Sequence, residues 1–341
     1  MSESFAPVRR RTIRVEDTAL VRTTYLAGDT ENFPLVIEPN VNGVDLVLWT
    51  HGHRALIESE LVKHGAILFR NFAVDSASQF RQFASALVPE LLDYLERAAP
   101  RREVAQNVFT STEYPADQPI PLHHEMSYSH NWPSKIWFYC AQPALARGAT
   151  PIANDRKVFK LIDPAIKERF MKKKVMYVRN FGEGLDLSWQ EAFQTEDRAA
   201  VEEYCRHARM SCEWRDGDRL RTRAQRQAVA THPQTNETVW FNHAHMFHVS
   251  NIDEPAREAL LAHFKEDELP RIAFYGDGSP IESSVLSEIR QIYSEAAVTF
   301  SWQKGDVLLL DNFLASHGRE PFTGPRSILV AMAELFTSSE V

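Results

Sequence analysis

Short apolar runs alternate with amphipathic stretches along this chain. Apolar runs of strand length that are bounded by turn residues are typical of buried strands. They predict strands at AILFRNF (66–72), KIWFYCAQP (135–143), VWFNHAHMFH (239–248), VTFSWQ (298–303), VLLLDNF (307–313) and SILVAMAELF (327–336). Apolar residues three and four positions apart predict helices instead. These are expected over 56–65, 76–99, 162–173, 254–265 and 283–293, with a kink or break at Pro89 in the second.

The order of these elements favours an α+β fold. Strands lie towards both ends of the chain with helices inserted between them, and Gly, Asp and Pro residues predict a turn at 304–306 and a loop at 317–326. A jelly roll closes many short strands into two packed sheets. We therefore expect a double-stranded β-helix (jelly-roll) core with flanking helices and insertions. No repeat or linker divides residues 1–341, so a single domain is expected, with residues 1–15 as a flexible tail.

Composition and charge argue against several classes of protein. No apolar run approaches the roughly 20 residues that a membrane helix needs, and the N-terminus lacks the apolar segment of a secretion signal. Cys140, Cys205 and Cys212 fit no disulfide framework or zinc motif, so free thiols in a reducing compartment are expected. The net charge of −8 disfavours nucleic-acid binding. We expect a cytoplasmic protein with no membrane or nucleic-acid partner.

One segment is locally basic despite this acidic total. Glu213, Asp216 and Asp218 are interspersed among seven arginines: Arg206, Arg209, Arg215, Arg219, Arg221, Arg223 and Arg226. Such a segment is commonly a solvated face of mixed charge. The alternative is a docking patch for an acidic partner protein.

The sequence His123-His124-Glu125 offers a candidate metal site. Alternate side chains of a strand point to the same face, so His123 and Glu125 can approach one ion. Two imidazoles and one carboxylate on one octahedral face leave three positions open, which suits an Fe(II) ion that activates O₂. His124 should face the other side, unless a bulge in the backbone exchanges the two histidines. The motif is short, so its meaning depends on a third ligand.

Two residues near the C-terminus supply that context. His317 follows the apolar strand 307–313 and is expected at the start of the Gly- and Pro-rich loop, where it can be the third ligand. Arg326 opens the next apolar strand, and a buried guanidinium needs a partner. A dicarboxylate co-substrate would supply one, because a guanidinium grips a carboxylate with two hydrogen bonds. An internal salt bridge is the alternative.

Several segments together resemble the TauD/TfdA group of Fe(II)/2-oxoglutarate dioxygenases, which have a clavaminate synthase-like jelly roll. The resemblance runs from about residue 60 to the C-terminus. It rests on TSTEYP, IPLHHEMSY, GATPIAND, VWFNHAHMFH, FYGDGSPIE and WQKGDVLLLDNFLASHGREPFTGPR. Within the group, the chain is most similar to SyrP-like hydroxylases. Those enzymes modify amino-acid units in nonribosomal peptide pathways, often on a carrier protein.

The resemblance implies a role for individual residues. Fe(II) would be bound by His123, Glu125 and His317, and these ligands are also the catalytic centre. Arg326 would hold the far carboxylate of 2-oxoglutarate with the help of Thr150, and O₂ would be the second co-substrate. The sequence departs from the common pattern in two places: Glu125 replaces the more usual aspartate, and Gly148-Ala149 replaces Gly-Gly. Neither change removes a ligand.

The implied reaction is hydroxylation of an unactivated C–H bond in an amino acid or an amino-acid-derived substrate. The substrate is either free or tethered to an acidic carrier protein, in specialised metabolism such as antibiotic biosynthesis. A carboxylate at position 125 favours hydroxylation over halogenation. Desaturation and epoxidation use the same ligands and are alternatives. More remote alternatives are a zinc hydrolase, since two His and one Glu also suit Zn²⁺, and a non-catalytic binding protein.

Further polar residues lie close to these motifs in sequence. Four are candidates for the substrate pocket by proximity alone: Asn107, Thr110, Ser127 and Trp240. His243, His245 and His248 are expected to line the pocket or to bond within the core, rather than to bind a second metal. Asp311 and Asn312 either orient the metal ligands or cap a strand end. Arg319 is expected to be a pocket residue or a surface residue that packs on the loop.

Overall fold

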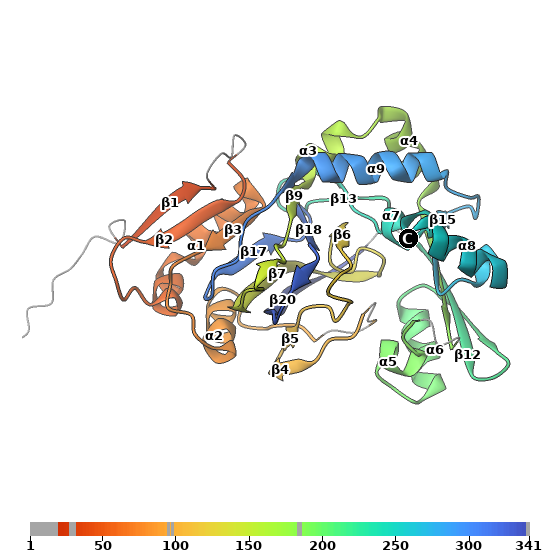
Figure 1. Cartoon of the computed structure of the whole chain (residues 1–341), viewed down its shortest axis with the longest axis horizontal. Coiled ribbons are helices and arrows are strands. Elements are labelled where there is room, and N and C mark those ends of the chain that lie inside the picture. The colour runs from red at the N-terminus through yellow and green to blue at the C-terminus, as the bar shows by residue number, and fades with distance from the viewer. Residues whose placement is uncertain (1–19, 27–31, 94–95, 97–98, 183–185, 339–341) are drawn as a thin grey trace, which may run out of the picture.

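The apolar strands of the C-terminal third form the centre of a large, mostly antiparallel sheet (Figure 1). The computed structural model describes residues 20–26, 32–93, 96, 99–182 and 186–338, so the expected tail over 1–15 lies outside the described residues. The sheet has the order β1 (Val21–Tyr25), β2 (Leu35–Pro39), β3 (Ala66–Phe69), β17 (Val307–Asp311), β7 (Asn131–Gln142), β20 (Ser327–Thr337), β5 (Val108–Thr110) and β4 (Glu103–Ala105).

A smaller sheet faces the large one and completes the jelly roll. Its order is β16 (Ala297–Val298), β9 (Ile152–Asn154), β18 (Ala315–Arg319) and β6 (Ile120–His123). The chain crosses from β17 in the large sheet to β18 in the small sheet within residues 312–314. Alternate residues of β17 point to opposite faces. Leu308 and Leu310 therefore pack in the core that includes Ile152 and Ala315 of the small sheet.

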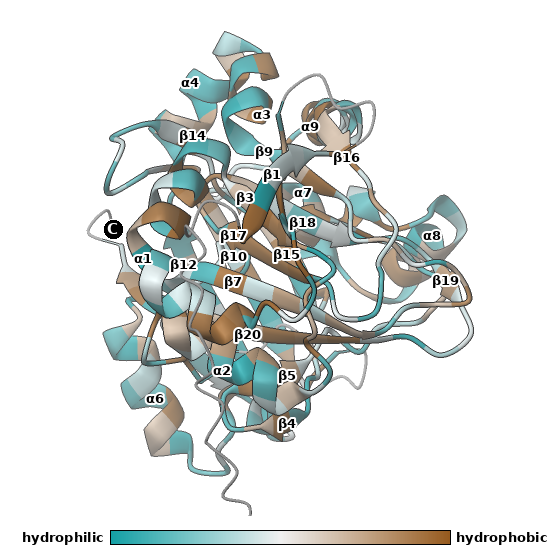
Figure 2. Ribbon diagram, turned by 90° about the vertical axis from the view of Figure 1, so that its left-hand side faces the viewer, coloured by the Kyte–Doolittle hydropathy of each residue, from teal (hydrophilic) through white to brown (hydrophobic). Residues whose placement is uncertain are grey.

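The other face of the large sheet is covered by helices. Val307 and Leu309 of β17 pack in a second core with residues of α1 (Leu46–His64) and α2 (Ala77–Leu87). Asp45 caps α1 by accepting a hydrogen bond from the backbone N–H of Leu48, and Gly65 ends the helix with φ of 78°. Figure 2 shows the hydrophobic colour gathered on the central strands β7, β17 and β20. Each central strand is thus buried on both faces.

A third sheet lies beyond β6, on the side away from β1 and β2 (Figure 1). It has the order β11 (Ser211–Arg215), β12 (Arg219–Arg226), β10 (Val175–Phe181) and β15 (Arg271–Tyr275). The helices of this half are α3 (Asp155–Leu161), α4 (Pro164–Lys173), α5 (Trp189–Phe193), α6 (Arg198–His207), α7 (Ala244–Phe247), α8 (Glu254–His263) and α9 (Ser283–Ala296). Smaller elements are the pairs β13 (Val229–Thr231) with β14 (Thr238–Trp240) and β8 (Ala146–Arg147) with β19 (Phe322–Thr323), and the 3₁₀ turns η2 (Val249–Asn251) and η3 (Glu266–Glu268).

This arrangement confirms the predicted α+β class and jelly-roll core, but several element boundaries were wrong. The predicted helix 76–99 ends at Leu87, which confirms the break expected at Pro89, because Val88 before this proline is extended. The predicted strand 239–248 ends at Trp240 and continues into α7, where Asn242 accepts a hydrogen bond from the backbone N–H of Ala244. The predicted strand 298–303 pairs only at its first residue.

The predicted loop 317–326 contains most of a strand. His317 and Arg319 belong to β18, which is buried along its whole length. Its sequence, ASHGR, has no alternation of apolar residues, so no hydrophobic pattern marked it as a strand. The metal-site candidate His317 is therefore held by a backbone ladder rather than by a free loop.

The structure also bears on the cysteines and on membrane-spanning helices. Cys140, Cys205 and Cys212 are free cysteines, as predicted. None of the helices in the described part of the chain combines the length and the hydropathy that crossing a bilayer would require.

Candidate metal centre

Strands β6 and β18 bring the three candidate ligands together. His123, the last residue of β6, lies directly opposite His317 of β18 in the antiparallel register. Glu125 follows in the turn after β6. One nitrogen of each histidine and one carboxylate oxygen of Glu125 all lie within 4.8 Å of one another. In the part of the chain that the structure describes, this is the only such group of three or more histidine, cysteine or acidic residues.

The two imidazoles have the form that a metal ion needs. His123 Nδ1 lies 2.8 Å from the carbonyl oxygen of Pro121, so this nitrogen carries the proton and Nε2 keeps its lone pair. Burial lowers the pKa of His123, and it lowers the pKa of His317 well below its ordinary value. Both rings are therefore neutral at neutral pH. The donor set of two neutral imidazoles and one carboxylate fits Fe(II).

Asn312 fixes the backbone that carries Glu125. Its Oδ1 accepts from the backbone N–H of Glu125 at 2.8 Å, and its Nδ2 donates to the carbonyl oxygens of Glu125 and Pro133 at 2.9 and 2.8 Å. Asn312 also lies in the connection between β17 and β18, which leads to His317. One buried amide thus ties together the segments that carry two of the three candidate ligands. These contacts fit the first of the two roles expected for Asn312, which is to orient the candidate ligands.

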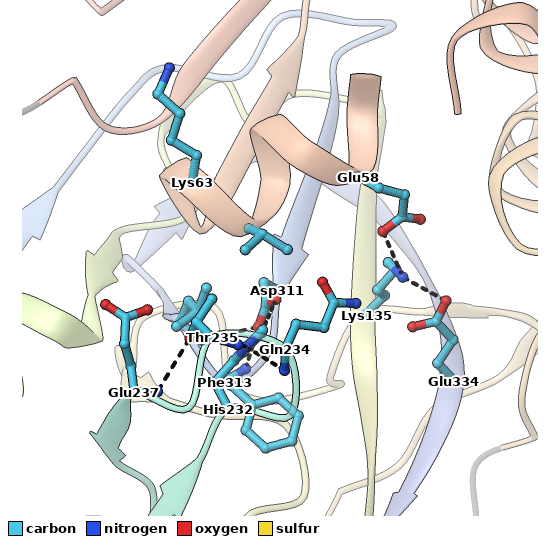
Figure 3. A network of polar contacts seen from close by, with 12 residues as sticks. Glu58, Lys63, Lys135, His232, Gln234, Thr235, Glu237, Asp311, Phe313 and Glu334 are labelled. Carbon is cyan, nitrogen blue, oxygen red and sulfur yellow. Dashed lines mark hydrogen bonds and ion pairs between the residues drawn. The ribbon is translucent and has the colours of Figure 1, made fainter. Parts of the chain in front are cut away.

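Asp311 takes the other expected role and caps the end of β17. Its Oδ1 accepts from the backbone N–H groups of Phe313 and Leu314, and its Oδ2 lies 2.9 Å from His232 Nε2. The backbone N–H groups of Gln234 and Thr235 point at His232 Nδ1, so Nε2 is the protonated nitrogen. Figure 3 shows this pair.

A second polar group lies beside that pair. Buried Lys135 on β7, the residue opposite Asp311 in the ladder, contacts both Glu58 and Glu334 (Figure 3). The carboxylates balance the charge that burial of the ammonium would otherwise leave unpaired. The end of β17 is thereby held on the side away from the candidate ligands.

Arg101 was not predicted from the sequence, although it contacts the candidate carboxylate ligand directly. The buried Arg101 Nη2 lies 2.8 Å from Glu125 Oε2. The arginine precedes β4, stands in no recognisable motif and is 24 positions from its partner. An ion pair of this kind fixes which oxygen of Glu125 is available and compensates its charge.

Replacing Arg101 by glutamine should weaken Fe(II) binding by about 10- to 100-fold, the usual effect of losing a group that orients a ligand. The matched control is Arg102→Gln, because the Arg102 side chain is 79% exposed and pairs with Glu113 at the surface. Anaerobic titration with Fe(II) measures both variants. Equal affinity in the two variants would contradict the role given to Arg101.

Arg326 and Thr150 form a second polar site. Arg326 Nη2 donates to Thr150 Oγ1 at 3.3 Å, and Arg326 Nε donates to the carbonyl oxygen of Gly148 at 2.9 Å. Trp302 Nε1 also donates to Thr150 Oγ1, at 3.0 Å. Because two donors already point at Thr150 Oγ1, the hydroxyl proton of Thr150 can be donated to a further acceptor. Such a donor beside a cation suits a carboxylate.

The internal salt bridge considered for Arg326 is not found among the described residues. Burial lowers the pKa of Arg326 to about 10, helped by the nearby charge of Arg319, so the side chain stays cationic at neutral pH. Its place depends on Gly148, which has φ of +75°. A Cβ there would lie 2.8 Å from Phe322 Cβ and 3.3 Å from Arg326 Cδ. Because Gly148 has no Cβ, it leaves space for the Arg326 side chain.

The remaining histidines do not join the metal site. His124 is fully buried, lies 3.2 Å from Asp155 and packs against Phe241, so the exchange with His123 does not occur. His245 bonds to the carbonyl oxygen of Leu122. His248 bonds to Ser250, which confirms core bonding for both. Only His243 lies against a candidate ligand, with its ring 5.3 Å from that of His123.

The four candidate substrate residues are widely dispersed. Asn107 lies in the turn between β4 and β5, where it bonds to Asp93, and Trp240 is fully enclosed against Phe170. A substrate role has no support at these two positions. Thr110 accepts from the backbone N–H of Arg102 and stays a prediction. Ser127, in contrast, follows the candidate ligand Glu125 closely.

Arg319 is buried rather than exposed at the surface. Its guanidinium donates to the carbonyl oxygens of Tyr114, Pro115 and Gln118. It therefore fixes the segment 114–118 against β18.

The arginine-rich segment is not one basic face. Arg226 is fully buried and donates to the carbonyl oxygens of Ala208 and Arg209. Arg221 is also buried and pairs with Asp267. Three further arginines form ion pairs at or near the surface: Arg206 with Glu203, and both Arg215 and Arg223 with Glu213. The expected solvated face of mixed charge holds only for the exposed arginines of the segment. The alternative, a docking patch, has no support at Arg221 and Arg226, because their positive charge is used within the fold.

A jelly roll that carries two histidines and a carboxylate on adjacent segments, with a partly buried arginine after the second histidine, is the architecture of Fe(II)/2-oxoglutarate oxygenases. Comparison of the sequence with known protein families leads to the same class of protein. Residues 26–332 match the taurine catabolism dioxygenase TauD, TfdA family, and the chain belongs to this family. Fe(II), 2-oxoglutarate and O₂ are the standard requirements of the family, and they are the cofactor and co-substrates of this chain.

Two relatives are similar over most of the chain. The dapdiamide synthesis protein DdaC of Enterobacter agglomerans is 46% identical over 285 residues, which cover 83% of this chain and 87% of that protein. A clavaminate synthase-like protein of Arabidopsis thaliana is 32% identical over 324 residues, which cover 90% of this chain and 95% of that protein.

Solved structures share the fold. PvcB of Pseudomonas aeruginosa has a TM-score of 0.54 at 17% identity, covering 95% of this chain and 94% of that one. AAD-2 in complex with Mn(II) and N-oxalylglycine has a TM-score of 0.53 at 14% identity, covering 92% and 96%. Together with family membership, the shared fold favours the dioxygenase over the zinc hydrolase and the non-catalytic protein.

Proposed function

We propose that this dioxygenase hydroxylates an unactivated C–H bond of an amino acid or an amino-acid-derived substrate in a biosynthetic pathway. The observation that carries the proposal is the pair of polar sites: three metal-ligand side chains within 4.8 Å, and a cationic Arg326 beside the Thr150 hydroxyl. The similarity to a dapdiamide synthesis protein supports a biosynthetic role. We further propose that the chain works as one catalytic domain in the cytoplasm, consistent with its three free thiols.

In this proposal, His123 Nε2, His317 Nε2 and an oxygen of Glu125 hold Fe(II). Once bound, the iron supplies the oxidising chemistry: it uses O₂ and 2-oxoglutarate to cleave a C–H bond and releases succinate and CO₂. The protein supplies position and charge. Arg326 and Thr150 hold the distal carboxylate of 2-oxoglutarate. Phe138, whose ring lies 4.8 Å from that of His317, keeps water from one side of that imidazole.

Glu125 bears on the outcome of the reaction. Its carboxylate takes the ligand position that a halide would need, so transfer of oxygen is favoured over transfer of halogen. The ion pair with Arg101 holds that carboxylate in place. Desaturation and epoxidation use the same ligands, and the mass of the product separates desaturation from oxygen insertion.

A substrate tethered to an acidic carrier protein remains part of the proposal. The surface that would receive such a carrier is not the whole of the arginine-rich segment, because Arg221 and Arg226 are buried. Charge reversal at either of these two would disturb the fold. Exposed Arg223 is the better position for that substitution.

The test is to supply the Fe(II)-loaded enzyme with 2-oxoglutarate, ¹⁸O₂ and the protein amino acids, each both free and as a thioester on a carrier protein. The proposal predicts succinate formation together with one ¹⁸O atom in the product. Loss of two hydrogens without oxygen would indicate a desaturase. Succinate formation that no amino-acid compound stimulates would contradict the substrate class.

A further inference from the structure

Ser127 and His243 form a buried hydrogen-bonded pair next to the candidate metal ligands. Ser127 Oγ lies 2.5 Å from His243 Nδ1, and the serine is fully buried. Ser127 belongs to the turn that carries Glu125, whereas His243 precedes α7. The ring of His243 contacts those of His123, Tyr128 and Phe247, with centroids 5.1 to 5.5 Å away. Neither residue has a part in holding the iron or 2-oxoglutarate.

The hydrogen bond between Ser127 and His243 determines which ring nitrogen of His243 carries the proton. A hydroxyl shielded from water must donate to a protein acceptor, and His243 Nδ1 is the one partner of Ser127 Oγ among the described residues. Nδ1 must therefore be the unprotonated nitrogen, which places the ring proton on Nε2. The reverse arrangement would leave the serine proton buried without an acceptor.

His243 Nε2 is left with a proton and no partner within the described part of the chain. The backbone of the residue is fully engaged: its N–H donates to the Tyr177 hydroxyl at 2.6 Å, and its carbonyl accepts from Met246 and Phe247. The His243 ring is buried and its centroid lies 5.3 Å from that of His123. An unused N–H donor therefore lies beside a candidate metal ligand.

From this placement we propose that His243 binds a carbonyl or carboxylate oxygen of the primary substrate through its Nε2–H, with Ser127 fixing the tautomer. This deepens the proposed function and rests on it. The recognised group is a hydrogen-bond acceptor, such as an amide, thioester or carboxylate oxygen, and not the substrate ammonium. The oxygen comes from the substrate rather than from 2-oxoglutarate, for which the chain provides Arg326 and Thr150.

The first arm of the test observes the ring proton directly. Two-bond ¹⁵N–¹H correlation spectra of the full-length, Zn(II)-loaded protein with ¹⁵N-labelled histidine distinguish the two tautomers. His243→Gln assigns the signal, and His232, whose Nε2 proton is fixed by two backbone donors at Nδ1, is the internal reference. We expect the Nε2–H tautomer in the wild type and a mixture in Ser127→Ala. The Nδ1–H tautomer in the wild type would overturn the proposal.

The second arm identifies the source of the oxygen. Addition of N-oxalylglycine to the Zn(II)-loaded protein should leave the His243 Nε2–H signal in place. A large shift would assign the contact to the co-substrate and overturn the proposal as stated.

The third arm uses the pool of free and carrier-bound amino acids with the Fe(II) enzyme. His243→Leu, which lacks a donor, should raise KM for the oxygenated compound about 3- to 10-fold, the effect of one lost neutral hydrogen bond. His243→Gln, whose amide N–H replaces the Nε2 donor, should restore most of it. Equal KM values for the two variants would show a merely structural role. If the wild-type enzyme oxygenates no compound in the pool, the proposed function is wrong. The tautomer measurement still shows whether the Ser127–His243 pair has the predicted proton arrangement.

Discussion

Replacing His317 by alanine is expected to abolish both Fe(II) binding and turnover of 2-oxoglutarate. The ring of His317 lies 4.5 Å from that of His123, and its Nε2 is 3.8 Å from Glu125 Oε2. Without it, two ligands remain on a site that needs three protein donors to hold the ion. The expected loss of affinity exceeds the roughly 100-fold that follows from disturbing a group behind a ligand. Anaerobic Fe(II) titration and succinate release measure the two effects.

The neighbouring histidines provide the control for this prediction. His123→Ala should lose iron as His317→Ala does, whereas His124→Asn should still bind it, because His124 points to Asp155 instead. Iron bound normally by His123→Ala but lost in His124→Asn would exchange the two assignments. Circular dichroism of each variant separates loss of metal from loss of fold.

The second large effect is expected from Arg326→Leu, which should raise KM for 2-oxoglutarate steeply. Removing one partner of a buried, hydrogen-bonded charge pair costs about 2–5 kcal/mol, which is roughly 30-fold to several thousand-fold in affinity. Arg326→Lys keeps the charge but loses the planar pair of donors, so an intermediate value is expected. Calorimetric titration with N-oxalylglycine measures binding without turnover.

Arg147→Leu is the matched control for Arg326→Leu. Arg147 lies on β8, next to Gly148, and its side chain is exposed. Its loss should leave the affinity for N-oxalylglycine unchanged. An equal effect in both variants would mean that Arg326 acts through general charge rather than by direct contact.

The candidate site residues that could be predicted from the sequence stand beside recognisable strands or motifs. His317 and Arg326 stand beside long apolar strands, and both strands form the centre of the large sheet. The paired residues His123 and Glu125 also lie together in the fold, although Glu125 sits in a turn rather than on a regular strand face. Met126, with φ of 58°, marks the change of direction. His123 and Glu125 therefore lie close together as predicted, although the strand geometry expected for them holds only in part.

What the sequence could not show are contacts that depend on the tertiary fold. Arg101 reaches Glu125, and Asn312 clamps the same residue across 187 positions of sequence. Neither contact leaves a periodic or spaced pattern. The prediction for Trp240 lacks structural support for the same reason, because closeness in sequence to a histidine cluster does not determine where an indole side chain lies.

The burial of Arg221 and Arg226 was equally hidden in the sequence. In a strand, successive side chains alternate between faces. Arg221 nevertheless lies buried between two other buried residues, Leu220 and Thr222, where it bonds to Asn180 and Asp267. Charge counting along the segment therefore overstated the positive surface. The contacts of each guanidinium are needed to distinguish an exposed docking face from an internal network of ion pairs and hydrogen bonds.

The most direct test is anomalous diffraction at the iron edge from anaerobic crystals grown with Fe(II) and 2-oxoglutarate. We expect one iron bonded to His123 Nε2, His317 Nε2 and a single oxygen of Glu125, with the distal carboxylate of 2-oxoglutarate against Arg326 and Thr150. An iron peak at another group of residues, or a 2-oxoglutarate molecule whose distal carboxylate lies away from Arg326, would contradict it.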